Sequence, residues 1–197
     1  FTLSAAGVPT DHVMQMALGT SLATIIFTSI SSAGAHHRHQ AVNWELVCSI
    51  APGIIAGSLL GSWLAAKLQT DILKLIFTIF VFAVGTELMF NAHPKPRRKL
   101  PARMAVTFVG AVIGALSSLI GIGGGSLSVP FMVYCNVSMR EAVGTSSAIG
   151  FPIALAGATG YAIAGYQVQG LPPFTVGYNY LQALAGIALA SVLTVRI

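Results

Sequence analysis

The sequence predicts an all-α protein, a polytopic transmembrane helical bundle with broken helices and an internal repeat. Hydrophobic residues make up 55% of the 197 positions and charged residues only 8%, against roughly 25% in soluble domains. Two stretches, of 36 residues after Arg103 and 54 residues after Glu141, contain no Asp, Glu, Lys or Arg. A helix needs about 20 mostly apolar residues to cross a bilayer. The period-2 alternation of a membrane β-barrel is absent.

Apolar segments divide the chain into successive predicted spans. The expected spans cover residues 13–33, 44–66, 72–90, 104–120, 142–165 and 178–195. Polar turns are expected at 9–11, 36–39 and 67–74, and a Gly/Pro/Tyr-rich loop at 166–177. A proline inside a helix removes one hydrogen bond, so Gly150-Phe151-Pro152 is expected to interrupt the fifth span. Residues 1–8 and 194–197 resemble pieces of apolar segments, so both ends are expected to be cut from a longer protein.

A glycine-rich stretch, Gly121-Ile122-Gly123-Gly124-Gly125-Ser126-Leu127-Ser128-Val129-Pro130, separates two apolar runs. Glycine is unfavourable in a helix interior. Inside a bilayer, broken backbone survives only where it is buried in protein or lines a polar cavity, and transporters build substrate sites from such breaks. The apolar piece that follows, 127–137, is too short to span, at about 16 Å as helix. The alternative is that these glycines only let helices pack closely. No Lys-Ser/Thr follows them, which argues against a phosphate-binding loop.

The second predicted span carries a different glycine pattern. Gly53, Gly57 and Gly61 are spaced by four residues, which places them on one helix face. Small residues on one face let a neighbouring helix approach closely. We therefore expect this series to serve packing rather than substrate binding.

Half of the ten basic residues gather in one short segment. They are Lys95, Arg97, Arg98, Lys99 and Arg103. The positive-inside bias predicts that loop 91–103 is cytoplasmic, and a topological role explains the net charge of +5 without any nucleic-acid partner. The loop separates a first half, 1–92, from a second half, 104–197, with 93–103 between them. Counting spans from it places 36–39 inside and 166–177 outside.

A short repeat links the two halves. Ala17-Leu18-Gly19-Thr20-Ser21 recurs as Ala142-Val143-Gly144-Thr145-Ser146, and each copy opens an apolar span. The predicted topology gives the two helices opposite directions, as in the inverted repeats of alternating-access transporters. For five positions, chance is the alternative.

These residues together resemble the TauE/SafE family of sulfite-exporter-like membrane proteins. The resemblance rests on the Gly-x-Gly-Gly-Gly…Pro segment at 121–130, on Ala-x-Gly-Thr-Ser at 142–146, and on the first-half series of a His-rich loop, Trp44, Pro52-Gly53 and the following glycines. It implies export of sulfite or related organosulfur anions. In the family pattern, a first glycine-rich segment would precede Phe1 and a further helix would follow Ile197, so the chain resembles a truncated member.

An anionic substrate needs hydrogen-bond donors in a dry place. Helix N-termini supply unpaired N–H groups and a positive dipole end, and the two Gly-Thr-Ser motifs are expected near such N-termini. Hydroxyls can donate to an oxyanion; alternatively, they cap or back-bond their own helices. The predicted substrate-binding set is Gly19, Thr20, Ser21, Gly121, Gly123, Gly124, Gly125, Ser126, Pro130, Gly144, Thr145 and Ser146.

Other polar residues are weaker candidates for a functional role. Glu87, near the end of the third span, could carry a coupling proton or lie among the headgroups. Arg140 could attract an anion or pair with lipid. The histidines of 36–39 have no adjacent Cys or acidic residue, so no metal site and no cofactor are predicted. Cys48 and Cys135 fall in apolar segments and are expected to be small buried hydrophobes.

The sequence therefore predicts a multi-pass transporter of the cell membrane that exports a small sulfur-containing anion and is not an enzyme. Its expected partners are that anion and the lipid bilayer; its oligomeric state is not predicted. An intramembrane serine protease would need a base near its nucleophile, but no histidine follows His93. A non-transporting scaffold is the alternative function. It would explain packing glycines but not two Gly-Thr-Ser helices beside a backbone break.

Overall fold

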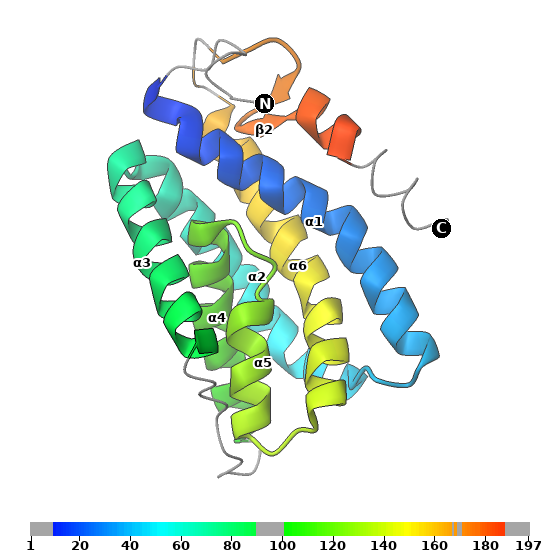
Figure 1. The fold of residues 1–197 in the computed structure, drawn as a ribbon. Coiled ribbons are helices and arrows are strands. Elements are labelled where there is room, and N and C mark those ends of the chain that lie inside the picture. The colour runs from blue at the N-terminus through cyan, green and yellow to red at the C-terminus, as the bar shows by residue number, and fades with distance from the viewer. Residues whose placement is uncertain (1–9, 90–100, 167, 169–170, 188–197) are drawn as a thin grey trace.

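The computed structural model describes residues 10–89, 101–166, 168 and 171–187, which form a helical bundle with one short hairpin (Figure 1). The helices are η2 (Thr10–His12), α1 (Val13–Arg38), α2 (Trp44–Lys67), α3 (Thr70–Met89), α4 (Arg103–Ile120), α5 (Gly125–Tyr134) and α6 (Met139–Gly165). Strands β1 (Thr175–Val176) and β2 (Asn179–Tyr180) pair antiparallel. Residues 181–187 begin a further helix, and the rest of the predicted last span lies outside the described residues.

Four of these helices are long and apolar enough to cross a membrane: α1, α2, α4 and α6, with 26, 24, 18 and 27 residues. At 1.5 Å per residue they measure about 27 to 40 Å, against a hydrocarbon core of about 30 Å. The expected fold class, an all-α bundle of transmembrane helices, is confirmed. Helix α3 forms where the third span is predicted, and its membrane crossing stays a prediction.

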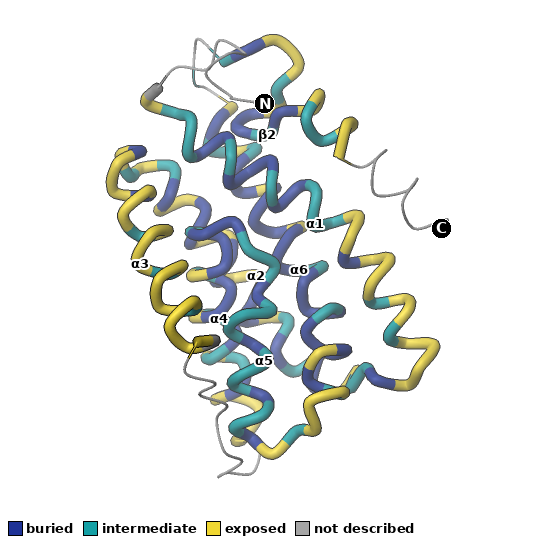
Figure 2. The backbone as a smooth tube through the Cα atoms, in the orientation of Figure 1, coloured by how far each residue is buried: buried dark blue, intermediate teal, exposed yellow. Residues whose placement is uncertain are grey.

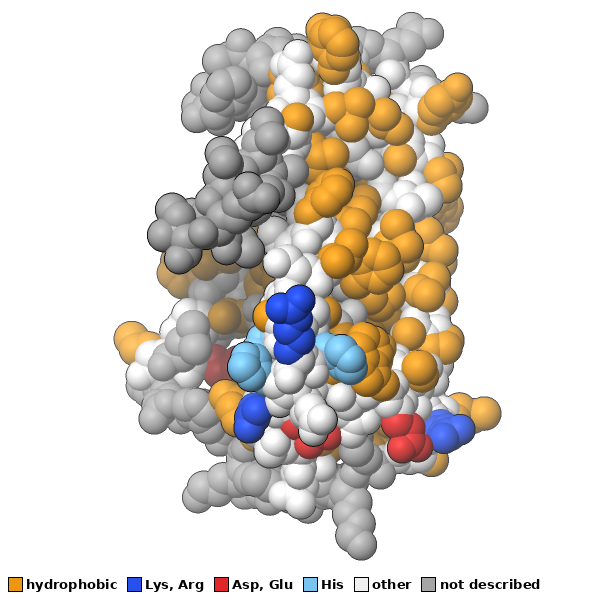
Figure 3. Space-filling view, turned by 90° about the vertical axis from the view of Figure 1, so that its right-hand side faces the viewer, with side chains coloured by type: hydrophobic (Ala, Val, Ile, Leu, Met, Phe, Trp, Pro, Cys, Tyr) orange, Lys and Arg blue, Asp and Glu red, His pale blue; other side chains and the backbone are white. Residues whose placement is uncertain are grey.

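The outer surface of the bundle is hydrophobic. Leu60 on α2, Phe82 on α3 and Phe108 on α4 are 60%, 72% and 71% exposed. Figure 3 shows hydrophobic side chains over the upper part of one face, while its charged and histidine side chains gather in the lower part. In water such a surface would drive aggregation, whereas lipid chains solvate it.

Helix α6 forms the centre of the core. Ile149, Ile153 and Tyr161 are fully buried on it, and it packs between α1 and α2 (Figures 1 and 2). Helix α3 lies at the edge, with exposed residues along most of its length. The well-packed unit is therefore α1, α2, α4 and α6.

The glycine series of α2 packs against α4, as predicted. A Cβ added at any of the three glycines would overlap backbone atoms of α4. On the other side of the contact, Gly110 of α4 lies against Ile50 of α2. The pairs are Gly53 with Thr107, Gly57 with Ala111, and Gly61 with Ala115.

The predicted turn at 36–39 is wrong, because α1 continues to Arg38. Basic residues in a last turn interact favourably with the negative end of the helix dipole. The reversal comes instead at Gln40, which has a positive φ of 51°. His37 remains in the last turn, where its Nδ1 accepts a hydrogen bond of 3.1 Å from Trp44 Nε1.

The predicted interruption at Gly150-Phe151-Pro152 is also wrong. Helix α6 runs unbroken from Met139 to Gly165. In a membrane bundle, neighbouring helices compensate for the hydrogen bond that a proline removes. The helix also begins three residues before the expected start, because the Ser138 side chain accepts the Glu141 N–H at 3.3 Å and caps it. The turn at 67–74 is likewise shorter than expected, since α3 begins at Thr70.

Helices α1 and α6 run in opposite directions (Figure 1). Gly19 lies against Tyr161, and Leu22 lies against Gly157. Further along, Ser29 lies near Gly150, so the residue number falls on α6 as it rises on α1. The two Gly-Thr-Ser copies are therefore inverted relative to each other, and α5 returns the chain to the end of the bundle where α6 begins.

Candidate functional site

The glycine-rich stretch breaks the helix, as predicted. Gly121 ends α4 with φ 75°, and Gly124 precedes α5 with φ 78°. This left-handed conformation is unfavourable by about 1–2 kcal/mol for residues with a Cβ. Gly125 and Ser126 form the first turn of α5, and Pro130 lies inside that helix. The short segment after the break is thus a half-helix of 10 residues, about 15 Å long.

The break is enclosed between α1 and α6. A Cβ at Gly121 would meet Leu18 of α1, and one at Gly124 would meet Ile153 of α6. The Ser21 hydroxyl donates to the Gly121 carbonyl at 2.9 Å. The irregular backbone is therefore buried in protein, as a break at membrane depth requires.

Beside the break lies a groove of about 420 Å³ between α1, the start of α5 and α6. We call it the hydroxyl groove, because five of its lining side chains are hydroxyls and no described residue that lines it is charged. It is lined by Ile25, Thr28, Ser29, Ser32, Gly123, Gly125, Val129, Val143, Ser146, Ser147 and Gly150.

The hydroxyl groove offers donors of two kinds. The first amides of a helix have no intrahelical partner, and Gly125, the first residue of α5, lines the groove. The hydroxyls of Ser29 and Ser147 donate to carbonyls of their own helices at 3.0 and 3.1 Å. They must therefore rotate to donate to a ligand. Ser146 shares a 2.8 Å hydrogen bond with the buried Ser128.

The two threonines of the repeat lie elsewhere. Helix α1 begins at Val13 and α6 at Met139, so Thr20 and Thr145 sit about two turns inside their helices. The expectation that they lie at helix N-termini is wrong, because α1 already begins at Val13, as hydropathy predicts, and Ser138 caps α6 three residues before its expected start. Thr145 Oγ1 accepts the Asn43 N–H at 3.0 Å.

The groove gathers only part of the predicted set. Gly123, Gly125 and Ser146 line it. The others pack around the break or against loops, and the substrate-binding role of the whole set stays a prediction. These remaining members are Gly19, Thr20, Ser21, Gly121, Gly124, Ser126, Pro130, Gly144 and Thr145.

Four hydroxyl residues that line the groove were not in the predicted set: Thr28, Ser29, Ser32 and Ser147. A signal for them exists on α1. Thr24, Thr28 and Ser32 recur every four residues, which makes a polar stripe on an otherwise apolar helix.

The weaker candidates lie outside the groove. Glu87 is exposed in the last turn of α3, and its proton-carrying role stays a prediction. Arg140 donates to the His39 carbonyl at 2.7 Å beside a separate pocket of about 380 Å³. Of the cysteines, Cys135 is buried as expected, whereas Cys48 is exposed.

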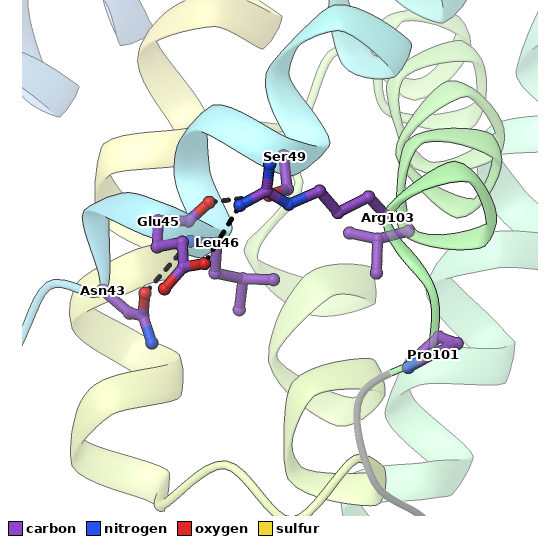
Figure 4. Close-up of a pocket in the computed structure, with 7 residues that line it drawn as sticks. Asn43, Glu45, Leu46, Ser49, Pro101 and Arg103 are labelled. Carbon is purple, nitrogen blue, oxygen red and sulfur yellow. Dashed lines mark hydrogen bonds and ion pairs between the residues drawn. The ribbon is translucent and has the colours of Figure 1, made fainter.

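A smaller cavity of about 200 Å³ lies where α2 and α4 begin (Figure 4). Arg103 crosses it to pair with Glu45 at 3.2 Å, and both side chains are 81% exposed. Exposed ion pairs contribute little stability. Most of the basic loop that precedes Arg103 lies outside the described residues. This cavity is a surface feature at the charged end of the bundle.

Comparison with known proteins adds to this geometry. The chain matches the family described as "Sulfite exporter TauE/SafE" over residues 2–197. It is 30% identical to a probable membrane transporter protein of Haemophilus influenzae, over 100% of this chain and 75% of that protein. It is also 30% identical to YunE of Bacillus subtilis, a probable membrane transporter protein, over 89% of this chain and 67% of that one.

An archaeal relative extends this range. The probable membrane transporter protein MJ0441 of Methanocaldococcus jannaschii is 29% identical, over 97% of this chain and 68% of its own length. No solved structure matches the chain. The glycine break, the Gly-Thr-Ser helices and the spanning helices all occur within the matched residues, and the chain belongs to the sulfite exporter TauE/SafE family of membrane proteins.

Proposed function

We propose that this protein exports a small sulfur-containing anion, sulfite or a sulfonate, across the cell membrane by alternating access. The observation that carries the proposal is the hydroxyl groove beside the start of a broken helix. Neither a cofactor nor a catalytic step belongs to this proposal. A scaffold role would give no use to a groove lined by hydroxyls beside a broken helix.

The chemistry of the groove favours an anion over a cation. Sulfite and sulfonate present oxygen acceptors, which suit hydroxyl groups and the free amides at the start of α5. That helix end also contributes a partial positive charge of about +0.5. A cation would need carboxylates, and among the described residues none lines the groove. Because the site has no fixed full charge, it can bind the anion and also release it.

The transport test compares hydroxyl variants in proteoliposomes that contain the full chain. Ser32→Ala and Ser147→Ala remove hydroxyls of the groove, from α1 and α6. A hydrogen bond to a charged group contributes about 1.5–3 kcal/mol, so each change should raise the KM for sulfite by about 10- to 150-fold. Thr159→Val is the matched control, because Thr159 lies exposed on α6 outside the groove and bonds only to Leu155.

Two results would count against the proposal. If neither serine variant alters the KM of any sulfur oxyanion that the wild type carries, the groove is not the binding site. If the wild type moves cations with no dependence on an anion, the substrate class is wrong.

We further propose that loop 91–103 faces the cytoplasm. The charge distribution supports this, because the lower end of the bundle carries Arg38, Glu45, Arg103, Arg140 and Glu141. Cysteines at Gln40 and Val176, both exposed and at opposite ends of the bundle, would test it. A membrane-impermeant maleimide applied to intact cells should modify the Val176→Cys protein and spare Gln40→Cys. The reverse pattern would invert the topology.

A further inference from the structure

The two copies of the Gly-Thr-Ser motif make the same contact at opposite ends of the bundle. At one end, Gly144 lies against the Ala41 carbonyl, and Thr145 Oγ1 accepts the Asn43 N–H at 3.0 Å. We call this contact, of Gly144, Thr145, Ala41 and Asn43, the Asn43 clamp. It lies where α2 and α6 begin, at the lower end in Figure 1.

At the other end, Gly19 lies against the Asn179 side chain and the Tyr178 carbonyl, and Thr20 Oγ1 accepts the Tyr180 N–H at 3.0 Å. This contact, of Gly19, Thr20, Tyr178 and Tyr180, is the Tyr180 clamp. It lies beside β2, at the upper end in Figure 1.

The match between the clamps extends to their sequence steps. In each clamp the glycine approaches the carbonyl of one residue and the threonine binds the amide two residues later. Both held segments directly precede a helix, at Trp44 and at Leu181. A chance recurrence of a five-residue sequence would not reproduce this geometry. The geometry therefore supports the interpretation that the two halves contain a duplicated structural unit.

Each clamp joins the two halves of the chain. The motif of α1, in the first half, holds a segment of the second half, and the motif of α6 holds a segment of the first half. Thr145 is 0% exposed and Thr20 is 7% exposed, so water does not compete strongly for either hydrogen bond. Such an exchange is the arrangement that a two-fold axis between inverted repeats would produce.

The clamps differ in how fully their asparagines are bonded. The Asn43 side chain donates to Glu141 Oε1 at 2.7 Å and accepts the Leu46 N–H at 3.0 Å. Asn179, within the segment held by the Tyr180 clamp, donates to the Ala158 carbonyl at 3.0 Å. Its Oδ1, however, is buried and finds no partner among the described residues. A buried acceptor without a partner is unfavourable, so the Tyr180 clamp is the easier one to open.

We propose that Thr20 and Thr145 are positioning residues that hold closed the two opposite ends of the transport path. The hydroxyl groove lies between α1 and α6, the helices that carry the two threonines. Opening one clamp while the other stays formed would expose the groove to one side of the membrane at a time. This inference rests on the proposed transport function, although its test needs no substrate.

The test measures access to the groove from each side of the membrane. A single cysteine replaces Ser29, which lines the groove and is 5% exposed, with Cys48 and Cys135 changed to alanine. Thr20→Val and Thr145→Val then keep the side-chain shape and remove the acceptor of each clamp. An impermeant maleimide is applied to right-side-out and to inside-out vesicles.

We expect opposite shifts. Thr145→Val should raise the labelling rate from the Asn43 end, and Thr20→Val should raise it from the Tyr180 end. Each amide left buried without a partner corresponds to a rate increase of about 5- to 150-fold. Thr20→Ser and Thr145→Ser keep the acceptor and should label like the parent, as should Thr159→Val.

A merely structural role would change labelling from both sides alike, and that result would overturn the proposal. If a valine variant does not reach the membrane, Asn179→Ala weakens the Tyr180 clamp and leaves Thr20 in place. It should raise labelling from the Tyr180 end only, and an unchanged rate would contradict the clamp. Opposite shifts, together with no sulfur-anion transport by the protein whose groove residues are unchanged, would support the clamps and reject the proposed function. Normal sulfite transport, with labelling rates that the valine variants leave unchanged, would support the proposed function and reject the clamps.

Discussion

Substituting Gly57 with alanine tests the glycine contact between α2 and α4. An ideal Cβ at Gly57 would lie 2.7 Å from the carbonyl carbon of Ala111, whereas ordinary contacts of a Cβ lie at 3.4–4 Å. The obstructing atoms belong to a helix backbone, which cannot rotate away as a side chain can. Because the Ala111 carbonyl oxygen would lie closer still, the two helices must separate locally by at least about 0.7 Å, and the neighbouring glycine contacts would loosen with them.

The expected magnitude follows from overpacking. Adding a methyl group to a well-packed contact typically destabilises a protein by about 1–3 kcal/mol. For a chain of this size, 1 kcal/mol corresponds to about 2–4 °C in melting temperature. Gly57→Ala should therefore lower the melting temperature by about 2–12 °C.

The assay is thermal unfolding of the detergent-solubilised protein, followed by tryptophan fluorescence. Gly85→Ala is the matched control: it adds the same methyl group to a helix, but nothing lies within 4 Å of the added atom. The control should unfold at the parent temperature or slightly above it, because alanine is the better helix former by up to about 1 kcal/mol. Equal melting temperatures for the two variants would refute the close contact.

Three further predictions use the same preparation. Gly121→Ala places a side chain at φ 75° and should lower the melting temperature by about 2–8 °C; an unchanged value would show that the break can relax. Tyr161→Phe removes a buried hydrogen bond of 3.0 Å to the Ser118 carbonyl and should lower it by about 2–4 °C, unless the carbonyl finds another donor. In mass-spectrometric labelling, N-ethylmaleimide should modify the exposed Cys48 before the buried Cys135, and the opposite order would contradict the packing of α2 and α5.

Composition and hydropathy predicted a helix well where its two ends coincide with the ends of the apolar stretch. The second span, expected at 44–66, is observed as Trp44–Lys67, and the fourth, expected at 104–120, as Arg103–Ile120. The glycine break was predictable because two left-handed positions require glycine. Most errors occur at helix ends, where a helix continues beyond the apolar stretch, and one occurs inside α6, which continues through Pro152.

Local capping signals would have corrected one of these errors. Ser138 and Glu141 form the Ser-x-x-Glu pattern of a capped helix start, and α6 does begin just after Ser138. The extension of α1 through Arg38 has a weaker signal, the basic residues His36, His37 and Arg38 of its last turn, which are typical of a helix C-terminus.

The candidate site was only partly predictable. A glycine-rich break is visible in a sequence, and two of its glycines, Gly123 and Gly125, line the groove. The partners of Thr20 and Thr145 are not visible, because the hydrogen bonds reach across 160 and 102 positions. A hydroxyl that looks available for a ligand in sequence is already bonded to a distant amide.

The exchange of partners between the halves also governs how the protein must be built. A ribosome adds about 5–20 residues per second, so the Tyr180 amide is synthesised roughly 8–30 s after the Thr20 that receives it, 160 positions earlier. Until then Thr20 lacks its hydrogen-bond partner, so one end of the first half lacks its contact with the second half in the bilayer. The insertion machinery must protect that end. Neither half can form all of its contacts alone. Halves expressed as separate chains should therefore each be stable in the cell only when the other half is present.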